Sequence, residues 1–196
     1  MKEVFLNQSI KFITQYQKYD TFELAKLRYG LEGLYLTITK MIVLVFLALM
    51  LNIFEQVMLV IVLFNIIRYT GFGFHAEKSW QCLLISTFNF IMIPYVLLQI
   101  SFSNITTMII CGVCLIHYLL FAPADTKKRP LKNKRKRLIR KVLTVSIGLF
   151  YTILIWILHS NYWTSILLSV LIIQMIVISP ATYKIFHQPY NNYKRA

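Results

Sequence analysis

The chain has 196 residues, of which 58% are apolar, and it carries a formal net charge of +14. The distribution of charge excludes one soluble domain, because segments 79–124 and 142–183 contain no Asp, Glu, Lys or Arg. A helix needs about 20 residues to cross the hydrocarbon core of a bilayer, so each segment is long enough for two crossings. The sequence therefore predicts an all-α, polytopic membrane protein.

The positive charge is concentrated in one part of the chain. Ten of the 21 Lys and Arg residues lie within 127–141, between two apolar blocks. A loop of this kind marks the cytoplasmic side of a membrane protein and favours anionic lipid headgroups. Its placement argues against nucleic acid as a partner and predicts a bilayer with anionic lipids instead.

Residues 1–33 are expected to form amphipathic helices at the membrane interface. In segment 3–19, Leu6, Ile10 and Ile13 share one side, as in a helix that lies in the interface plane. Asp20 has the features of an N-cap, with Glu23 three residues later, and predicts a second helix from 21 to about 30. These helices either anchor the chain or form a platform for a partner.

Residues 34–179 are expected to form a domain of six transmembrane helices. A basic loop at 122–141 lies within this domain, and a tail at 180–196 follows it. The second span is short, about 20 Å of helix, and Pro94 predicts a kink in the third. The predicted spans are 34–51, 57–69, 80–100, 105–121, 142–158 and 164–178.

The loop charges predict the orientation of these spans. If 122–141 is cytoplasmic, the count of crossings places both termini and segment 70–79 on the cytoplasmic side as well. Lysines near both ends of the chain agree with this, and Glu55 is the one charged residue in the three predicted outer turns.

Segment 68–86 holds the candidate chemistry, His75 and Cys82. A thiol nucleophile needs a neighbour that takes its proton, and histidine is the usual partner. On one straight helix a seven-residue spacing would separate the two Cα atoms by about 10 Å. We therefore expect a break between them, with Gly71 and Gly73 supplying flexible backbone. A new helix beginning near 75–79 would also place Cys82 at a helix N-terminus, which stabilises a thiolate.

Other interpretations of these residues stay open at this stage. His75 and Cys82 could be packing or interface residues. Glu77 could orient His75 or pair with Lys78, and Arg68 or Lys78 could bind a carboxylate. No metal is expected, because His75, Glu77 and Cys82 match no zinc pattern, and the pair Cys111 and Cys114 in an apolar span is more typical of helix packing. The three cysteines give no disulfide framework, and no signal peptide is visible at the N-terminus.

Three motifs, in this order along the chain and with six spans, resemble the accessory gene regulator B (AgrB) family, membrane cysteine endopeptidases of Gram-positive quorum sensing. Phe72 and the residue before His75 depart from the family pattern GG-x-HA. The motifs are Arg28-Tyr29-Gly30-Leu31-Glu32; then Arg68-x-x-Gly71-x-Gly73-x-His75-Ala76 with Cys82 and Ser86; and finally Ala122-Pro123-Ala124-Asp125-Thr126 with Arg129-Pro130-Leu131.

The resemblance implies a role for each of these residues. Cys82 would be the nucleophile and His75 the general base and acid, with Arg68, Gly71, Gly73 and Ser86 in support. The substrate would be an AgrD-type precursor peptide, which loses its C-terminal tail through an acyl-thioester on Cys82 and closes into a thiolactone or lactone. No cofactor is implied. The basic loop would attract the acidic tail of the peptide, through Lys132, Lys134, Arg135, Lys136 and Arg137.

Two other classes of protein compete with a peptidase. A transporter or exporter of a small peptide would use the six spans, although they hold few polar groups and no internal repeat. A non-catalytic membrane adaptor would use the basic loop alone. A homodimer is compatible with either function, but no distinct motif indicates one.

Overall fold

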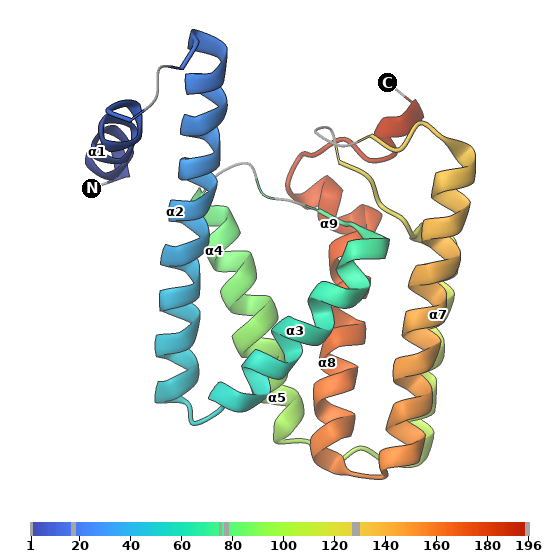
Figure 1. The fold of residues 1–196 in the computed structure, drawn as a ribbon. Helices are drawn as coiled ribbons and strands as arrows, with labels where there is room; N and C mark the ends of the chain where they lie inside the picture. The colour runs from blue at the N-terminus through green and yellow to red at the C-terminus, as the bar shows by residue number, and fades with distance from the viewer. Residues whose placement is uncertain (1, 17–18, 75, 77–78, 127–129, 195–196) are drawn as a thin grey trace. The chain divides into compact units, whose positions relative to one another are not determined.

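The computed structural model describes residues 2–16, 19–74, 76, 79–126 and 130–194. The described residues are mainly helical and contain no β-strand, apart from one isolated bridge between Phe72 and Ala124. The all-α prediction is confirmed. The elements are α1 (Lys2–Thr14), α2 (Thr21–Met50), α3 (Phe54–Gly71), α4 (Ser79–Thr87), the π-helical turn η1 (Phe88–Met92), α5 (Ile93–Leu98), α6 (Asn104–Phe121), α7 (Lys134–Leu158), α8 (Asn161–Ile178), α9 (Pro180–Ile185) and the 3-10 turn η2 (Asn192–Lys194) (Figure 1).

Among the described residues, 6 helical segments are long and apolar enough to cross a membrane. They are α2, α3, the α4–η1–α5 run over Trp80–Leu98, α6, α7 and α8. This confirms the expected number of spans and a multi-pass membrane protein. In the third span, the regular α-helix is interrupted next to Pro94, where a kink was expected. The π-helical turn η1 ends two residues before this proline.

Three of the predicted boundaries are wrong. No break separates an interfacial helix near 21–30 from the first span, since α2 is continuous from Thr21 to Met50. The second span, α3, has 18 residues, about 27 Å of helix, and is not short. The fifth begins at Lys134, where the Asn133 side chain caps the helix by accepting from two backbone amides.

Two of these differences, at α2 and at α7, follow from what allows a helix to continue. Within an otherwise helical run a glycine costs only about 1 kcal/mol, less than leaving backbone groups unpaired in an apolar medium. Gly30 and Gly33 therefore do not end α2. Charged residues can likewise continue a helix beyond the hydrocarbon core, as Lys134 to Lys141 do at the start of α7.

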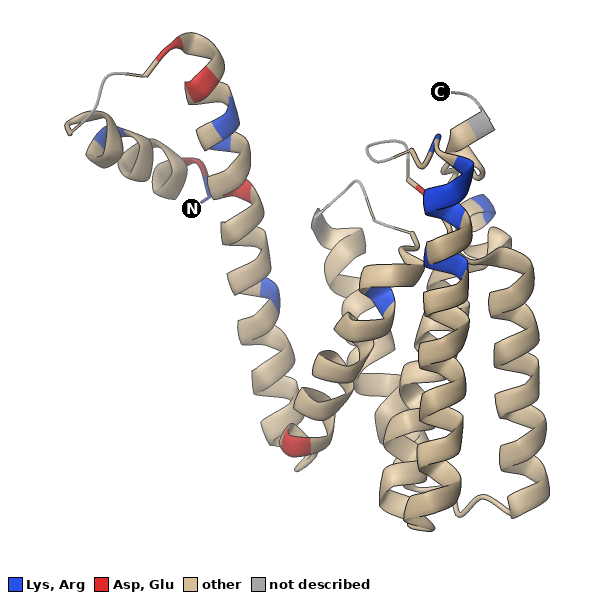
Figure 2. Cartoon of the chain, turned by 45° about the vertical axis from the view of Figure 1, so that its right-hand side comes forward, with Lys and Arg blue, Asp and Glu red and all other residues tan. Residues whose placement is uncertain are grey.

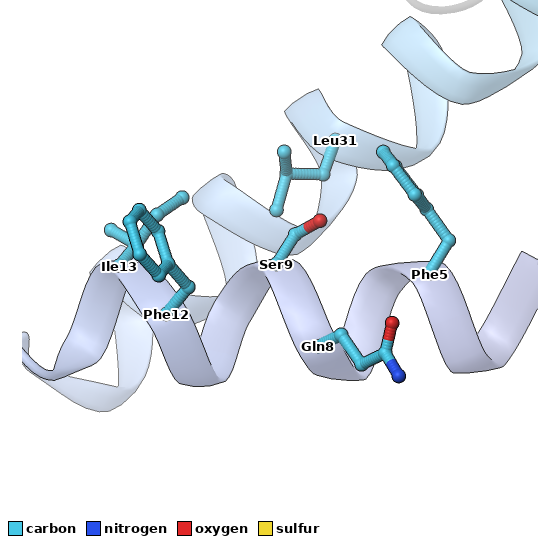
Figure 3. Close-up of a pocket in the computed structure, with 6 residues that line it drawn as sticks. All are labelled: Phe5, Gln8, Ser9, Phe12, Ile13 and Leu31. Atoms are coloured by element: carbon cyan, nitrogen blue, oxygen red, sulfur yellow. The ribbon is translucent and has the colours of Figure 1, made fainter.

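The chain divides into two compact units, Met1–Leu47 and Ala48–Ala196. In the first unit α1 lies beside the beginning of α2. Lys2 and Glu32 form an ion pair at 2.6 Å, as do Arg28 and Glu3. An open groove of about 560 Å³ lies between the helices (Figure 3). Leu31 of α2 lines it together with Phe5, Gln8, Ser9, Phe12 and Ile13 of α1.

Helix α8 is the centre of the second unit and packs against α3, α5, α6 and α7. Of the 18 residues of α8, 67% are buried, against 22–33% in the most apolar 18-residue stretch of each other span in this unit. Many large apolar side chains on those outer helices are exposed, Ile105 and Met108 of α6 among them. Such surfaces suit contact with lipid, and the central α8 holds the loop described next.

Candidate functional site

The predicted break between His75 and Cys82 is present. Helix α3 ends at Gly71 and α4 begins at Ser79, so Cys82 lies in the first turn of a new helix. Its side chain is half-buried and packs against the apolar core of the second unit. Ser86 lies one turn further along α4 and is buried. His75, Glu77 and Lys78 lie outside the described residues.

The backbone of the loop that follows α3 is held from both sides. Gly73 N–H donates to Ala124 O at 2.9 Å, and Ala124 N–H donates to Gly71 O at 3.1 Å. Phe74 N–H donates to Val177 O, near the end of α8, at 2.7 Å. Two motifs that lie about 50 residues apart in the sequence are therefore joined by backbone hydrogen bonds, with α8 beneath them.

Gly71 is needed here for space, and Gly73 both for space and for a positive φ. At Gly73, φ is +124° and an added Cβ would lie 2.8 Å from Val177 O. At Gly71 an added Cβ would overlap the Gln174 amide, which reaches across to Phe72 O at 3.4 Å. Few residues other than glycine adopt such a φ. Because neither position leaves room for a Cβ, the loop can lie directly on α8.

Arg68 connects the loop to the candidate nucleophile. Its guanidinium donates to Phe74 O at 2.8 Å and lies 5.5 Å from the centre of the Phe64 ring. Burial opposes the charge of Arg68, and electrostatic interactions with Tyr183 and with Cys82 favour it. Of the residues predicted for the site, hydrogen bonds therefore place Arg68, Gly71 and Gly73 at one loop, and Cys82 is linked to them by electrostatics.

The second motif contains a residue whose role the sequence did not reveal. The Asp125 side chain is 3% exposed, and each of its two oxygens accepts from a backbone amide. One amide is Leu131 N–H, at 3.2 Å, and the other is Asn192 N–H, at 3.0 Å. Hydrogen bonds to an ionised acceptor are among the stronger ones, so Asp125 ties the loop after α6 to the C-terminal segment.

Aromatic residues of the C-terminal segment complete the site. Tyr183 hydroxyl lies 3.2 Å from Ala124 O and 3.1 Å from Asp125 O, in position to donate to either. Burial raises the pKa of Tyr183, against the opposing effect of the Arg68 charge, so its hydroxyl stays a donor at neutral pH. Burial likewise raises the pKa of Tyr190 to about 12, and its hydroxyl donates to Phe121 O at 3.3 Å. In the sequence, the tyrosines that follow the last span were the one feature that could have indicated these contacts.

Known proteins share this sequence pattern over most of the chain. The model of the family described as Accessory gene regulator B matches residues 6–178. The chain belongs to the accessory gene regulator B family. It is therefore a membrane protein of the family that takes part in agr quorum sensing.

Relatives from three genera span most of this AgrB family chain. An AgrB-like protein of Listeria monocytogenes is 33% identical over 172 residues, 87% of this chain and 83% of the relative. An AgrB-like protein of Clostridium acetobutylicum is 26% identical over 183 residues, 92% of this chain and 87% of the relative. The accessory gene regulator protein B of Staphylococcus aureus is 28% identical over 171 residues, 86% of this chain and 91% of the relative. No solved structure matches.

The basic residues of this AgrB family protein gather where α7 begins (Figure 2). Lys132, Lys134, Arg135 and Lys136 are exposed. Arg137 is half-buried, and its guanidinium lies 3.3 Å from the centre of the Tyr193 ring. One helical turn further, Arg140 donates to Tyr69 O at 2.7 Å. The exposed charges are free to meet an anionic partner, whereas Arg140 belongs to the packing of α7 on α3.

Proposed function

We propose that this AgrB family protein is a membrane-embedded cysteine endopeptidase that removes the C-terminal tail of an AgrD-type precursor peptide and promotes its cyclisation. The observation that best supports the proposal is the setting of Cys82. This half-buried thiol lies in the first turn of α4, packs against the apolar core of the second unit, and interacts electrostatically with Arg68.

Two sources of positive charge act on Cys82. The first turn of a helix carries a partial positive charge from its unpaired amides, and Arg68 adds a full one. Because the site is partly buried, these interactions are stronger than they would be in water. His75, as the general base, would take the thiol proton in the first step.

The reaction is an acyl transfer in two steps. Cys82 Sγ attacks the carbonyl carbon at the junction between the peptide and its tail, the C–N bond breaks, and His75 gives its proton to the leaving amine. The peptide remains on Cys82 as an acyl-thioester. A cysteine thiol or serine hydroxyl within the peptide then attacks this carbonyl, which closes the ring and releases the Cys82 thiol. Ring closure needs water to be kept from the thioester, which favours a site at the edge of the bilayer.

The supporting residues have separate roles in this proposal. Arg68 donates to the Phe74 carbonyl, and its charge acts on Cys82. Gly71 and Gly73 allow the loop to lie on α8. Ser86 is buried one turn after Cys82 in α4, where it can support the thiol's side of the helix.

The basic residues support a proposal about the substrate's tail. Lys132, Lys134, Arg135, Lys136 and Arg137 would draw in an acidic segment of the precursor, and the loop would also favour anionic lipids. With this loop on the cytoplasmic side of a Gram-positive cell membrane, both termini and the site would lie on that side too. Association of two copies is compatible with the proposal but not required by it.

Processing of a precursor tests the proposal directly. The chain is co-expressed with an AgrD-type peptide, and the loss of the tail is followed by mass. Cys82→Ala and His75→Ala should each abolish tail removal at unchanged expression, whereas Cys111→Ala, which removes a buried thiol of α6, should retain it. Persistent processing by Cys82→Ala would refute the peptidase. Export of an unprocessed peptide would favour a transporter instead.

A further inference from the structure

The segment after the last span packs against the loop that follows α3. Phe74 is 4% exposed. Its ring stacks on Phe186 at 4.7 Å and meets Tyr183 edge-on at 5.9 Å. The family match ends at residue 178, so these two partners lie beyond the part of the chain that the family comparison covers.

The same segment is tied to the second motif by polar contacts. Tyr183 hydroxyl reaches Ala124 O, the oxygen that also accepts from Gly73 N–H. Asn192 donates from its backbone to the Asp125 carboxylate and from its amide to Asp125 O, at 3.3 Å. Aromatic packing on Phe74 and hydrogen bonds to the second motif thus hold the C-terminal segment on this loop.

Phe74 in turn determines where the Arg68 guanidinium lies. Both backbone polar groups of Phe74 are used: its N–H donates to Val177 O, and its carbonyl accepts from Arg68. The charge of the guanidinium also interacts electrostatically with Tyr183 and with Cys82. Ring contacts and hydrogen bonds therefore run from the C-terminal segment through Phe74 to Arg68, and the charge of Arg68 extends this link to Cys82.

We propose that segment 180–194 is a clamp that holds Phe74 and, through it, the Arg68 guanidinium whose charge acts on Cys82, with Tyr183 and Asp125 as positioning residues. The proposal rests on the proposed function, in which Cys82 is the nucleophile. Without the clamp, Phe74 would leave its place, Arg68 would lose its carbonyl partner, and its positive charge would no longer be held where it acts on Cys82.

The test compares Tyr183→Phe with Tyr193→Phe. Both variants delete one hydroxyl from the same segment, but the Tyr193 contact with Arg137 is made by its ring. Tyr183→Phe should lower kcat for precursor processing by about tenfold, the upper range for one lost hydrogen bond, with KM unchanged. Tyr193→Phe should match the wild type. Asp125→Asn, which loses one of the two acceptors for backbone amides, should behave like Tyr183→Phe and replaces it if that variant does not accumulate.

A second measurement separates positioning from loosened packing. Cys82 is alkylated with iodoacetamide at neutral pH in membranes, and peptide mass mapping separates it from Cys111 and Cys114. Loss of the neighbouring charge should slow alkylation of Cys82 in Tyr183→Phe by several-fold, because the thiolate is the reactive species. Loosened packing would expose the thiol and accelerate alkylation, which would overturn the proposal.

A double variant supplies the decisive comparison. Because Tyr183 acts through Arg68 in this proposal, Arg68→Gln combined with Tyr183→Phe should lose no more activity than Arg68→Gln alone. Independent, multiplying losses would overturn the clamp, as would wild-type kcat in both Tyr183→Phe and Asp125→Asn. If Cys82→Ala still processes precursor, the proposed function fails, whereas the alkylation rates still decide whether the clamp exists.

Discussion

Replacing Gly73 by alanine is the sharpest single test of the loop geometry. At this position φ is +124°, and an added Cβ would meet Val177 O at 2.8 Å and a Val177 methyl at 3.0 Å. The oxygen is the acceptor of Phe74 N–H and belongs to the backbone of α8, so it cannot turn away. The alanine must therefore move the loop.

The size of the effect follows from two contributions. A sparsely populated backbone conformation costs a residue with a Cβ about 1–3 kcal/mol. Loss of the Phe74 hydrogen bond adds about 0.5–1.5 kcal/mol. Together they come to about 1.5–4.5 kcal/mol, and each 1.4 kcal/mol is about a tenfold change in population. Gly73→Ala should lower the population of the correctly placed loop, and the rate of precursor processing, by about tenfold or more.

The assay is the initial rate of tail removal, followed by mass and corrected for the amount of protein in the membrane. Gly112→Ala is the matched control, because its added Cβ would meet nothing within 4 Å and lies in helix α6. That variant should process at the wild-type rate. Equal rates for Gly73→Ala and Gly112→Ala would show that processing does not depend on the path of the loop over α8, and would refute the reasoning from Gly73.

Three further predictions concern other parts of the second unit. Arg68→Lys should lower kcat at least tenfold, since a lysine ammonium lacks the planar guanidinium that donates to Phe74 O; rates near wild type would show that a charge alone is sufficient. Gly148→Ala should destabilise the folded protein by about 1–3 kcal/mol, because its Cβ would lie 2.9 Å from the Tyr118 ring. A thermal-unfolding midpoint in detergent equal to that of Gly112→Ala would contradict this. Replacing the basic residues at 132 and 134–137 by glutamate should raise KM for an acidic-tailed precursor, and an unchanged KM in correctly inserted protein would leave these charges with topology and lipid alone.

The sequence was sufficient for the membrane architecture. Long segments without charge require helices, because a bilayer offers no partner to unpaired backbone groups. For the same reason four of the six spans were predicted from 79–124 and 142–183, and the other two from the apolar block 34–67. Helix ends were less predictable: charged residues lie on both sides of the hydrocarbon boundary, and α7 begins at Lys134 within the basic segment.

The sequence by itself also determined that a new helix begins between His75 and Cys82, because seven residues on one helix would hold the two side chains apart. Only the tertiary structure decided what fixes the loop before that helix. Phe74, Ala124 and Tyr183 are far apart in the chain, and their hydrogen bonds and ring contacts exist only once α8 has been packed at the centre. Backbone pairing of this kind leaves no pattern in side-chain spacing, so the part played by Asp125 and the C-terminal segment emerged from the fold.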